Sequence, residues 1–254
     1  MASKKDEPSI CKFETEEDVA VGLATYISNL SDKFIKDKDS FTVVLSGGSL
    51  ISTMRKLIDY KNSIPWSKWF IFWLDERVVP LNDTDSNYKL AYDGLLSKVP
   101  IPHSNIFHIT EDLLPAAAAA DYEAKLKRLV EKKLLKLSDD GKYPIFDLML
   151  LGVGPDGHVA SLFPWLYQRY ETESWITFVN DSPKPPPPRI SMTFPVINWA
   201  SEIAIVVTGS YAANVVNVAL GKHTNNYLPL PVQDVSPVNG HLTWMLDNDA
   251  ASKL

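Results

Sequence analysis

The fold is set by the stretch Phe41-Thr42-Val43-Val44-Leu45-Ser46-Gly47-Gly48-Ser49, an apolar run that ends in a turn of small residues. Met54, Leu57 and Ile58 follow at helical spacing, so the stretch predicts a strand, a tight glycine turn and a helix. Small residues let backbone N–H groups converge on an anion such as a phosphate, which makes Ser46, Gly47, Gly48 and Ser49 candidate phosphate-binding residues. Two glycines in a tight strand-to-helix turn are also common for purely steric reasons, without any ligand. The turn has neither the Walker nor the dinucleotide-binding spacing, which disfavours nucleotides.

Strand-like and helix-like segments alternate on both sides of this turn. Thr15 precedes three acidic residues and then apolar residues at helical spacing, which predicts a first helix. Pro115 opens a long helix with apolar positions as far as Leu137. Further strands are expected at 69–74, 145–151, 175–179, 190–194 and 203–208, with another helix over 209–216. This order predicts an α/β fold with a mainly parallel sheet flanked by helices. No repeat or linker divides the chain, so we expect a single domain over residues 1–254.

Composition restricts the possible partners. The 254 residues carry a formal net charge of −6, which argues against a nucleic-acid binder but permits a small anionic ligand. Cys11 is the single cysteine and no apolar leader precedes it, so we expect a reducing compartment. No apolar run is long enough to cross a membrane. The chain ends in Ser252-Lys253-Leu254, a peroxisomal address; the alternative is a cytoplasmic enzyme without a targeting signal.

Three charged residues, Asp75-Glu76-Arg77, follow the apolar run 69–74 directly. Buried charges are costly unless they are paired, so these side chains should form ion pairs or face a cleft. A structural ion pair at a strand end explains them as well as a functional role does. Arg77 has the clearest use, because its forked donors can hold a phosphate, a carboxylate or a developing oxyanion. Asp75 and Arg77 are candidate catalytic residues.

The most informative motif runs from Gly154 to Pro164 and contains Gly154-Pro155-Asp156-Gly157-His158. We expect a sharp turn and then a helix start that directs His158 into a crevice at the edge of the sheet. A neutral imidazole there suits a general base, although a histidine with a purely structural role is the alternative. Asp156 is close enough in sequence to influence the imidazole.

Several other kinds of chemistry lack support in the sequence. The remaining histidines show no metal-ligand spacing, so no metal site is predicted; they are His103, His108, His223 and His241. There is no nucleophile elbow, and the one cysteine lacks a catalytic signature. Direct attack by water is therefore the simplest hydrolytic chemistry.

A proline-rich segment, Ser182-Pro183-Lys184-Pro185-Pro186-Pro187-Pro188-Arg189, lies between two predicted strands. Consecutive prolines favour an extended conformation without internal hydrogen bonds. The segment reads as a stiff surface loop that carries two cations, and the alternative is a docking motif for a proline-binding module.

Taken together with Asp85-Ser86-Asn87-Tyr88, these motifs resemble the 6-phosphogluconolactonase family over most of the chain, from Ser46 to residues 242–247. The resemblance implies a sugar-phosphate isomerase-like fold shared with glucosamine-6-phosphate deaminase, and no essential cofactor. It implies that His158 deprotonates the water that attacks a lactone carbonyl, and that Arg77 positions the substrate or stabilises the oxyanion. Lys184, Arg189 and the glycine turn would bind the phosphate.

The implied reaction is hydrolysis of 6-phospho-D-glucono-1,5-lactone to 6-phosphogluconate in the oxidative pentose phosphate pathway. The alternatives are an amino-sugar phosphate deaminase or isomerase, and a non-catalytic protein that binds sugar phosphates. Two departures from the family pattern stand out. Leu50-Ile51 replace the usual Thr-Pro, and Ala212 occupies the position we align with a lysine, so a phosphate-side cation is missing there. The sequence does not specify an oligomeric state.

Overall fold

A computed structural model describes residues 7–221 and 228–254 and contains a central sheet of six parallel strands. The strand order is β1-β11-β10-β7-β2-β3. The strands are β1 (Ser9–Phe13), β2 (Phe41–Leu45), β3 (Trp69–Trp73), β7 (Leu148–Leu151), β10 (Glu202–Val207) and β11 (His241–Asp247). Every residue of β2, β7 and β10 is buried, as expected for parallel strands covered on both faces. The predicted parallel sheet is confirmed.

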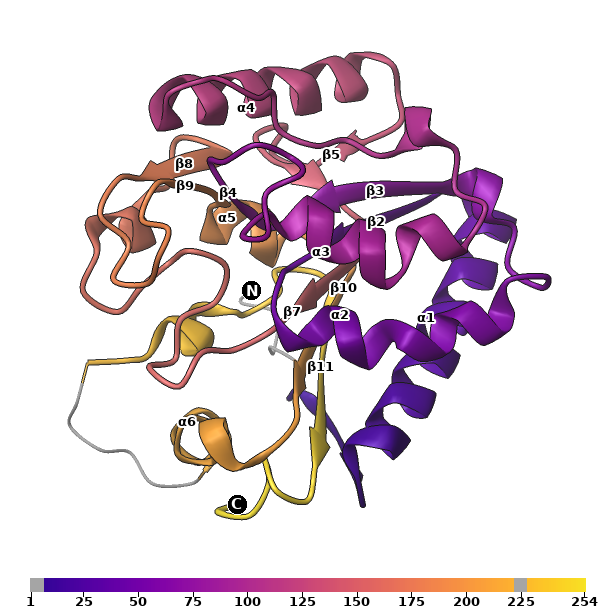
Figure 1. Cartoon of the computed structure of the whole chain (residues 1–254), viewed down its shortest axis with the longest axis vertical. Coiled ribbons are helices and arrows are strands. Elements are labelled where there is room, and N and C mark those ends of the chain that lie inside the picture. The colour runs from indigo at the N-terminus through magenta and orange to yellow at the C-terminus, as the bar shows by residue number, and fades with distance from the viewer. Residues whose placement is uncertain (1–6, 222–227) are drawn as a thin grey trace.

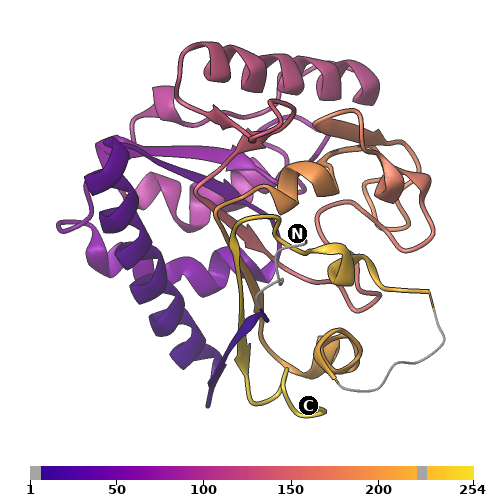
Figure 2. The ribbon, with the colours of Figure 1, turned by 180° about the vertical axis from the view of Figure 1, so that it is seen from behind.

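Helices cover both faces of this sheet, with α1 and α2 on one side and α6 on the other (Figures 1 and 2). The helices are α1 (Glu16–Lys38), α2 (Ser49–Thr53), α3 (Asn87–Gly94), α4 (Pro115–Glu131), α5 (Phe194–Asn198) and α6 (Ala213–Leu220). The 3₁₀ turns η1 (Met54–Tyr60) and η6 (Ser210–Ala212) extend α2 and precede α6. The expectation that the long helix reaches Leu137 is wrong: α4 ends at Glu131, and Leu137 lies in β5 (Lys136–Leu137), which pairs with β6 (Pro144–Ile145).

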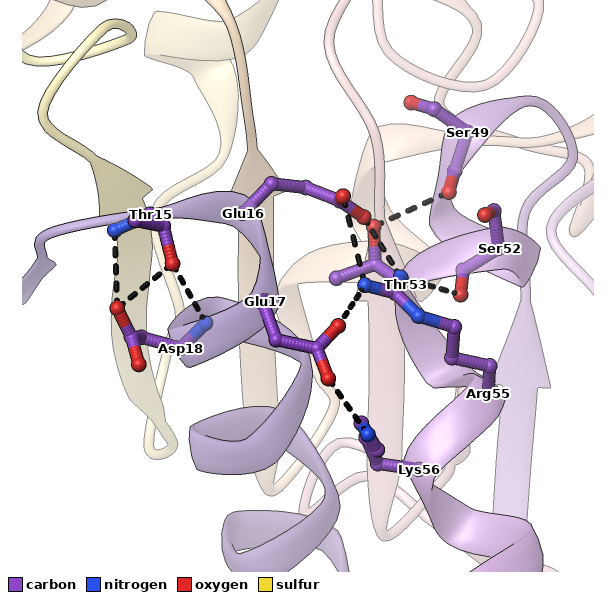
Figure 3. A network of polar contacts seen from close by, with 9 residues as sticks. All are labelled: Thr15, Glu16, Glu17, Asp18, Ser49, Ser52, Thr53, Arg55 and Lys56. Atoms are coloured by element: carbon purple, nitrogen blue, oxygen red, sulfur yellow. Dashed lines mark hydrogen bonds and ion pairs between the residues drawn. The ribbon is translucent and has the colours of Figure 1, made fainter.

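The start of α1 is fixed by a capping box and by ion pairs (Figure 3). The hydroxyl of Thr15 accepts a hydrogen bond from the Asp18 N–H, and the Asp18 carboxylate accepts one from the Thr15 N–H at 3.1 Å. Glu16 and Glu17 pair with Arg55 of η1, and Glu17 also pairs with Lys56. These contacts hold the segment α2–η1, and with it the glycine turn that precedes α2, against the first helix.

A second sheet, which the sequence did not predict, has the antiparallel order β4-β9-β8. Its strands are β4 (Asp75–Arg77), β9 (Arg189–Met192) and β8 (Ile176–Val179). Leu74 joins the two sheets, because its N–H donates to Leu45 O and its carbonyl accepts from Met192 N. The pairing places Arg77 directly opposite Arg189, although 112 positions separate them in the sequence.

The strand order creates a crevice beside the glycine turn. The strand that follows β2 in this sheet, β3, lies on one side of β2. On the other side lies β7, and the strand that follows β7 in this sheet, β10, lies next to β7 and away from β2. In an open α/β sheet, ligands bind outside the carboxyl ends of the strands where the order reverses in this way. The Ser46 hydroxyl, just after β2, accepts a hydrogen bond from Gly152 N–H, just after β7, at 3.1 Å. Within the described ranges, no helix is long and apolar enough to span a membrane.

Candidate functional site

A pocket of about 490 Å³ opens at this crevice. All the residues that the sequence analysis proposed for the site line it: Ser46, Gly47, Gly48, Ser49, Asp75, Arg77, His158, Lys184 and Arg189. They come from the segments that follow β2 and β7, from β4 and β9 of the second sheet, and from the proline-rich loop between β8 and β9. The spatial convergence that the sequence could only suggest is therefore present.

His158 is held by the carboxylate of Asp156. The imidazole Nδ1 and Asp156 Oδ1 are 2.5 Å apart, and the ring packs against Phe163 with 4.6 Å between ring centroids. If Nδ1 carries the proton donated to the carboxylate, Nε2 is left as an acceptor, and it has no hydrogen-bond partner among the described residues. In that tautomer the imidazole of His158, which lines the pocket, can accept a proton at Nε2.

The environment of Asp156 keeps this carboxylate ionised. Partial burial acts to raise the pKa of Asp156, but the hydrogen bond from His158 and the charges of His158 and Lys184 outweigh it. The resulting pKa lies below the usual value. Asp156 is thus a negatively charged orienting group for His158, a role that the sequence suggested only by proximity.

The backbone around His158 differs from the expectation. No helix follows the turn at 154–158; the chain makes further turns, and Ala160 adopts a left-handed backbone conformation with φ 52°. Gly154 is needed for a close approach, because a Cβ there would lie 2.1 Å from Nδ1 and Cε1 of His158. Residues with a strained backbone, such as Ala160, cluster at functional sites.

Arg77 has donors available for a ligand. Its NH1 donates to the carbonyl of Asp85 at 2.6 Å, which fixes the direction of the guanidinium. Its buried Nε has no hydrogen-bond partner within residues 7–221 and 228–254. Its NH2 makes no hydrogen bond to a described residue, so this end of the guanidinium is the one that a substrate oxygen in the pocket could accept from. The structure shows no ion pair of Arg77 with a described residue and places its side chain on the pocket.

The contacts of Asp75 and Glu76 favour positioning roles. Asp75 is buried, and its carboxylate accepts from the Ser161 hydroxyl at 2.7 Å and lies 3.5 Å from the Asn87 side-chain nitrogen. Glu76 is completely buried and accepts from the backbone N–H groups of Arg77, Asn87 and Tyr88. Burial raises the pKa of Glu76 to about 7 against these hydrogen bonds.

The glycine turn has the shape expected for an anion site but a shorter helix behind it. Gly48 has φ 71°, a conformation that favours glycine. The N–H groups of Gly47, Gly48 and Ser49 make no backbone hydrogen bond elsewhere in the described chain. However, α2 has five residues, so the helix dipole contributes less than the sequence suggested.

Lys184 and Arg189 differ in their surroundings. The Lys184 ammonium is partly exposed and lies 3.8 Å from Asp156 Oδ1. Arg189 is 3% exposed, and its guanidinium donates to the carbonyls of Lys184, Pro185 and Pro186. Burial lowers the pKa of Arg189, with the neighbouring Arg77 acting in the same direction. Arg189 therefore anchors the proline-rich loop from the pocket wall, and those carbonyls are not available to a proline-binding module.

Two pocket residues were missed by the sequence reasoning as site candidates. Asn87, in the quoted Asp-Ser-Asn-Tyr motif, donates to Asp75 O at 2.9 Å, and Tyr211 donates its hydroxyl to Val153 O at 3.4 Å. The signal for Tyr211 was its position just after the strand exit at Gly209. Ala212 beside it is buried, and the cations that line the described pocket are Arg77, Lys184 and Arg189.

No group of three potential metal ligands occurs in the described ranges, while His223 lies outside them.

Comparison with known proteins identifies the family. The sequence profile described as glucosamine-6-phosphate isomerases/6-phosphogluconolactonase matches residues 14–244. The chain is 51% identical over 253 residues to 6-phosphogluconolactonase 3, chloroplastic, of Arabidopsis thaliana, covering 99% of this chain and 77% of that protein. It is 48% identical to probable 6-phosphogluconolactonase 4 of the same plant, covering 95% of this chain and 93% of that one.

A solved structure agrees with this result. The crystal structure of 6-phosphogluconolactonase from Thermotoga maritima has 27% sequence identity and a TM-score of 0.79, covering 95% of this chain and all of that one. The family profile and the relatives confirm the resemblance found in the sequence motifs. The chain belongs to the glucosamine-6-phosphate isomerase/6-phosphogluconolactonase family.

Proposed function

We propose that this protein hydrolyses 6-phospho-D-glucono-1,5-lactone to 6-phosphogluconate, the lactonase step of the oxidative pentose phosphate pathway. One observation carries the proposal: the side chains of His158 and Arg77 line the same pocket, and the imidazole Nε2 has no hydrogen-bond partner in the described chain. The relatives at about 50% identity are named as lactonases, which favours this reaction over amino-sugar deamination.

The reaction needs no covalent intermediate. A water molecule attacks the lactone carbonyl carbon while His158 Nε2 accepts its proton, and Asp156 stabilises the imidazolium that forms. The carbonyl oxygen becomes an oxyanion that the guanidinium of Arg77 stabilises. The bond between the carbonyl carbon and the ring oxygen then breaks, and the imidazolium returns the proton to the leaving oxygen. The product carboxylic acid loses its own proton to solvent.

The phosphate end of the substrate is assigned to Lys184 and the turn 46–49. The ammonium of Lys184 reaches the pocket, and the free backbone N–H groups of the turn supply neutral donors. Arg189 contributes positive potential from the wall while its hydrogen bonds hold the loop. These three elements compensate for the cation that is missing at Ala212.

The test is hydrolysis of the phosphorylated lactone by purified protein, measured against the spontaneous rate. Loss of a general base costs about 10²–10⁴-fold, so His158→Ala should lose most of the catalysed rate while keeping the same thermal unfolding curve. Equal rates for the wild type and the variant would exclude the catalytic assignment of His158. Release of ammonia from glucosamine 6-phosphate would support the deaminase instead, and saturable phosphogluconate binding without turnover would support a sensor.

We further propose that the protein is cytoplasmic and is also imported into peroxisomes through Ser252-Lys253-Leu254. These residues are exposed, and the Lys253 ammonium makes a single side-chain hydrogen bond, to Asn214 Oδ1. The import receptor reads this tripeptide at a free chain end. A fluorescent fusion with a free C-terminus should show a punctate signal that disappears when residues 252–254 are removed. Identical diffuse signals from both fusions, or a plastid signal, would contradict import.

A further inference from the structure

The phosphate end and the catalytic end of the pocket share one carboxylate. Asp156 Oδ1 contacts the imidazole of His158 at 2.5 Å and the ammonium of Lys184 at 3.8 Å. The same oxygen atom therefore faces His158, the proposed base, and Lys184, which we propose binds the phosphate of the substrate. What happens to Lys184 on substrate binding must affect His158 through this atom.

The backbone of Lys184 is fixed, so its side chain is the part that can respond to a ligand. Ser182 Oγ accepts from the Lys184 N–H and donates to the Lys184 carbonyl. The same carbonyl accepts from Arg189 NH2 at 2.8 Å. In contrast, the ammonium makes no contact shorter than 3.8 Å to an acidic group of the described chain.

The other charged side chains that line the pocket have separate partners. Asp75 accepts from Ser161, Arg77 donates to the Asp85 carbonyl, and Arg189 is bound to the proline-rich loop. Within the described residues, Lys184 is therefore the one cation besides His158 that is paired with Asp156.

We propose that Lys184 restrains the base in the free enzyme and that the phosphate of the substrate releases this restraint by drawing the ammonium away from Asp156. This inference rests on the proposed lactonase function. With Lys184 close, part of the Asp156 charge is neutralised, and the imidazolium formed during proton transfer is stabilised less. When the phosphate binds Lys184 and draws the ammonium away, the whole carboxylate charge acts on His158.

As a consequence, the enzyme selects the phosphorylated lactone by hydrolysing it faster than a lactone without a phosphate. When a lactone without a phosphate binds, Lys184 stays paired with Asp156 and His158 is a weaker base. When the phosphorylated lactone binds, Lys184 moves away from Asp156 and His158 is a stronger base. Binding energy from a remote part of the substrate is thus used to lower the barrier at the reacting carbon.

The experiment uses glucono-1,5-lactone, which lacks the phosphate, with and without inorganic phosphite as a separate dianion. We take the lower end of the couplings found between binding sites, about five-fold, as the size of the effect, so phosphite should raise the wild-type kcat about five-fold. Lys184→Met should hydrolyse glucono-1,5-lactone about five-fold faster than the wild type and should not respond to phosphite. Lys132→Met, an exposed lysine at the end of α4, is the matched control and should behave as the wild type.

A lysine that only binds phosphate gives a different result. In that case Lys184→Met would hydrolyse glucono-1,5-lactone at the wild-type rate or more slowly, which would overturn the proposal. Activation of Lys184→Met by phosphite would also overturn it. Asp156→Asn removes the shared group and should abolish the phosphite response, and a response that persists would contradict the coupling. Failure of the wild type to hydrolyse the phosphorylated lactone would refute the proposed function itself and is measured separately.

Discussion

Replacement of Glu76 by glutamine should change how the stability of this protein depends on pH. Glu76 is completely buried, and each carboxylate oxygen accepts two hydrogen bonds: Oε1 from Arg77 N and Asn87 N, Oε2 from Tyr88 N and Ser86 Oγ. Burial nevertheless raises the pKa of Glu76 to about 7 from the ordinary value of 4.5. The carboxyl group therefore binds a proton in the folded protein over a range in which it is ionised in the unfolded chain.

The sign and size of the effect follow from linkage. Between pH 4.5 and about 7 the folded state holds the proton and the unfolded state has released it, so stability falls as pH rises. One pKa unit corresponds to about 1.4 kcal/mol, which makes the loss about 3 kcal/mol once the pH is well above 7. Glutamine does not titrate. Its amide NH₂ faces backbone donors and destabilises the protein, but this offset is independent of pH.

The assay is urea unfolding followed by tryptophan fluorescence at pH 5, 6, 7 and 8. The free energy of unfolding of the wild type minus that of Glu76→Gln should fall by about 2.5 kcal/mol across this range. Other titrating groups cancel in the difference. Glu131→Gln, at an exposed position on α4, should give a constant difference from the wild type. Parallel pH dependences for the wild type and Glu76→Gln would refute the reasoning.

Two further substitutions separate the site from the scaffold. In Gly154→Ala the new Cβ would lie 2.1 Å from the imidazole of His158 and would displace it. The lactonase rate should fall about 100-fold, because a small displacement of a catalytic group slows the reaction strongly. An unchanged rate would contradict the close packing. Asp147 pairs with Lys38 and accepts from Thr42 at the opposite end of β2 and β7, so Asp147→Ala should lower the free energy of unfolding by about 3–5 kcal/mol in urea titrations. The kcat of the folded Asp147→Ala protein should stay at the wild-type value, and a lower kcat would show that this pair also supports the site.

Much of the parallel sheet could be predicted from the sequence because its signals are local. The run 41–45 followed by small residues requires a strand and a turn, and Gly48 does adopt a backbone conformation with positive φ. The motif around His158 likewise identified a polar site at a strand exit. These features depend on neighbouring residues and on burial periodicity, which the sequence contains directly.

The second sheet and the partners of the charged groups could not be predicted in this way. Asp75-Glu76-Arg77 fitted a structural ion pair as well as a functional site. The structure shows instead that Asp75 accepts from Ser161, Glu76 accepts from backbone N–H groups, and Arg77 donates to the Asp85 carbonyl. The family resemblance implied that Arg189 binds the phosphate, and the structure adds that its hydrogen bonds hold the loop that carries Lys184. Such assignments depend on which atoms meet across a long sequence separation.

The sequence by itself therefore determined the α/β class, the family and several of the residues that line the pocket. Only the tertiary structure decided that Asp156 lies between His158 and Lys184, and that Arg77 lines the same pocket while its NH1 donates to the Asp85 carbonyl. The physical reason is that propensity and periodicity act over a few residues, whereas hydrogen bonding and charge pairing depend on distances of a few ångströms between segments that the chain brings together only on folding.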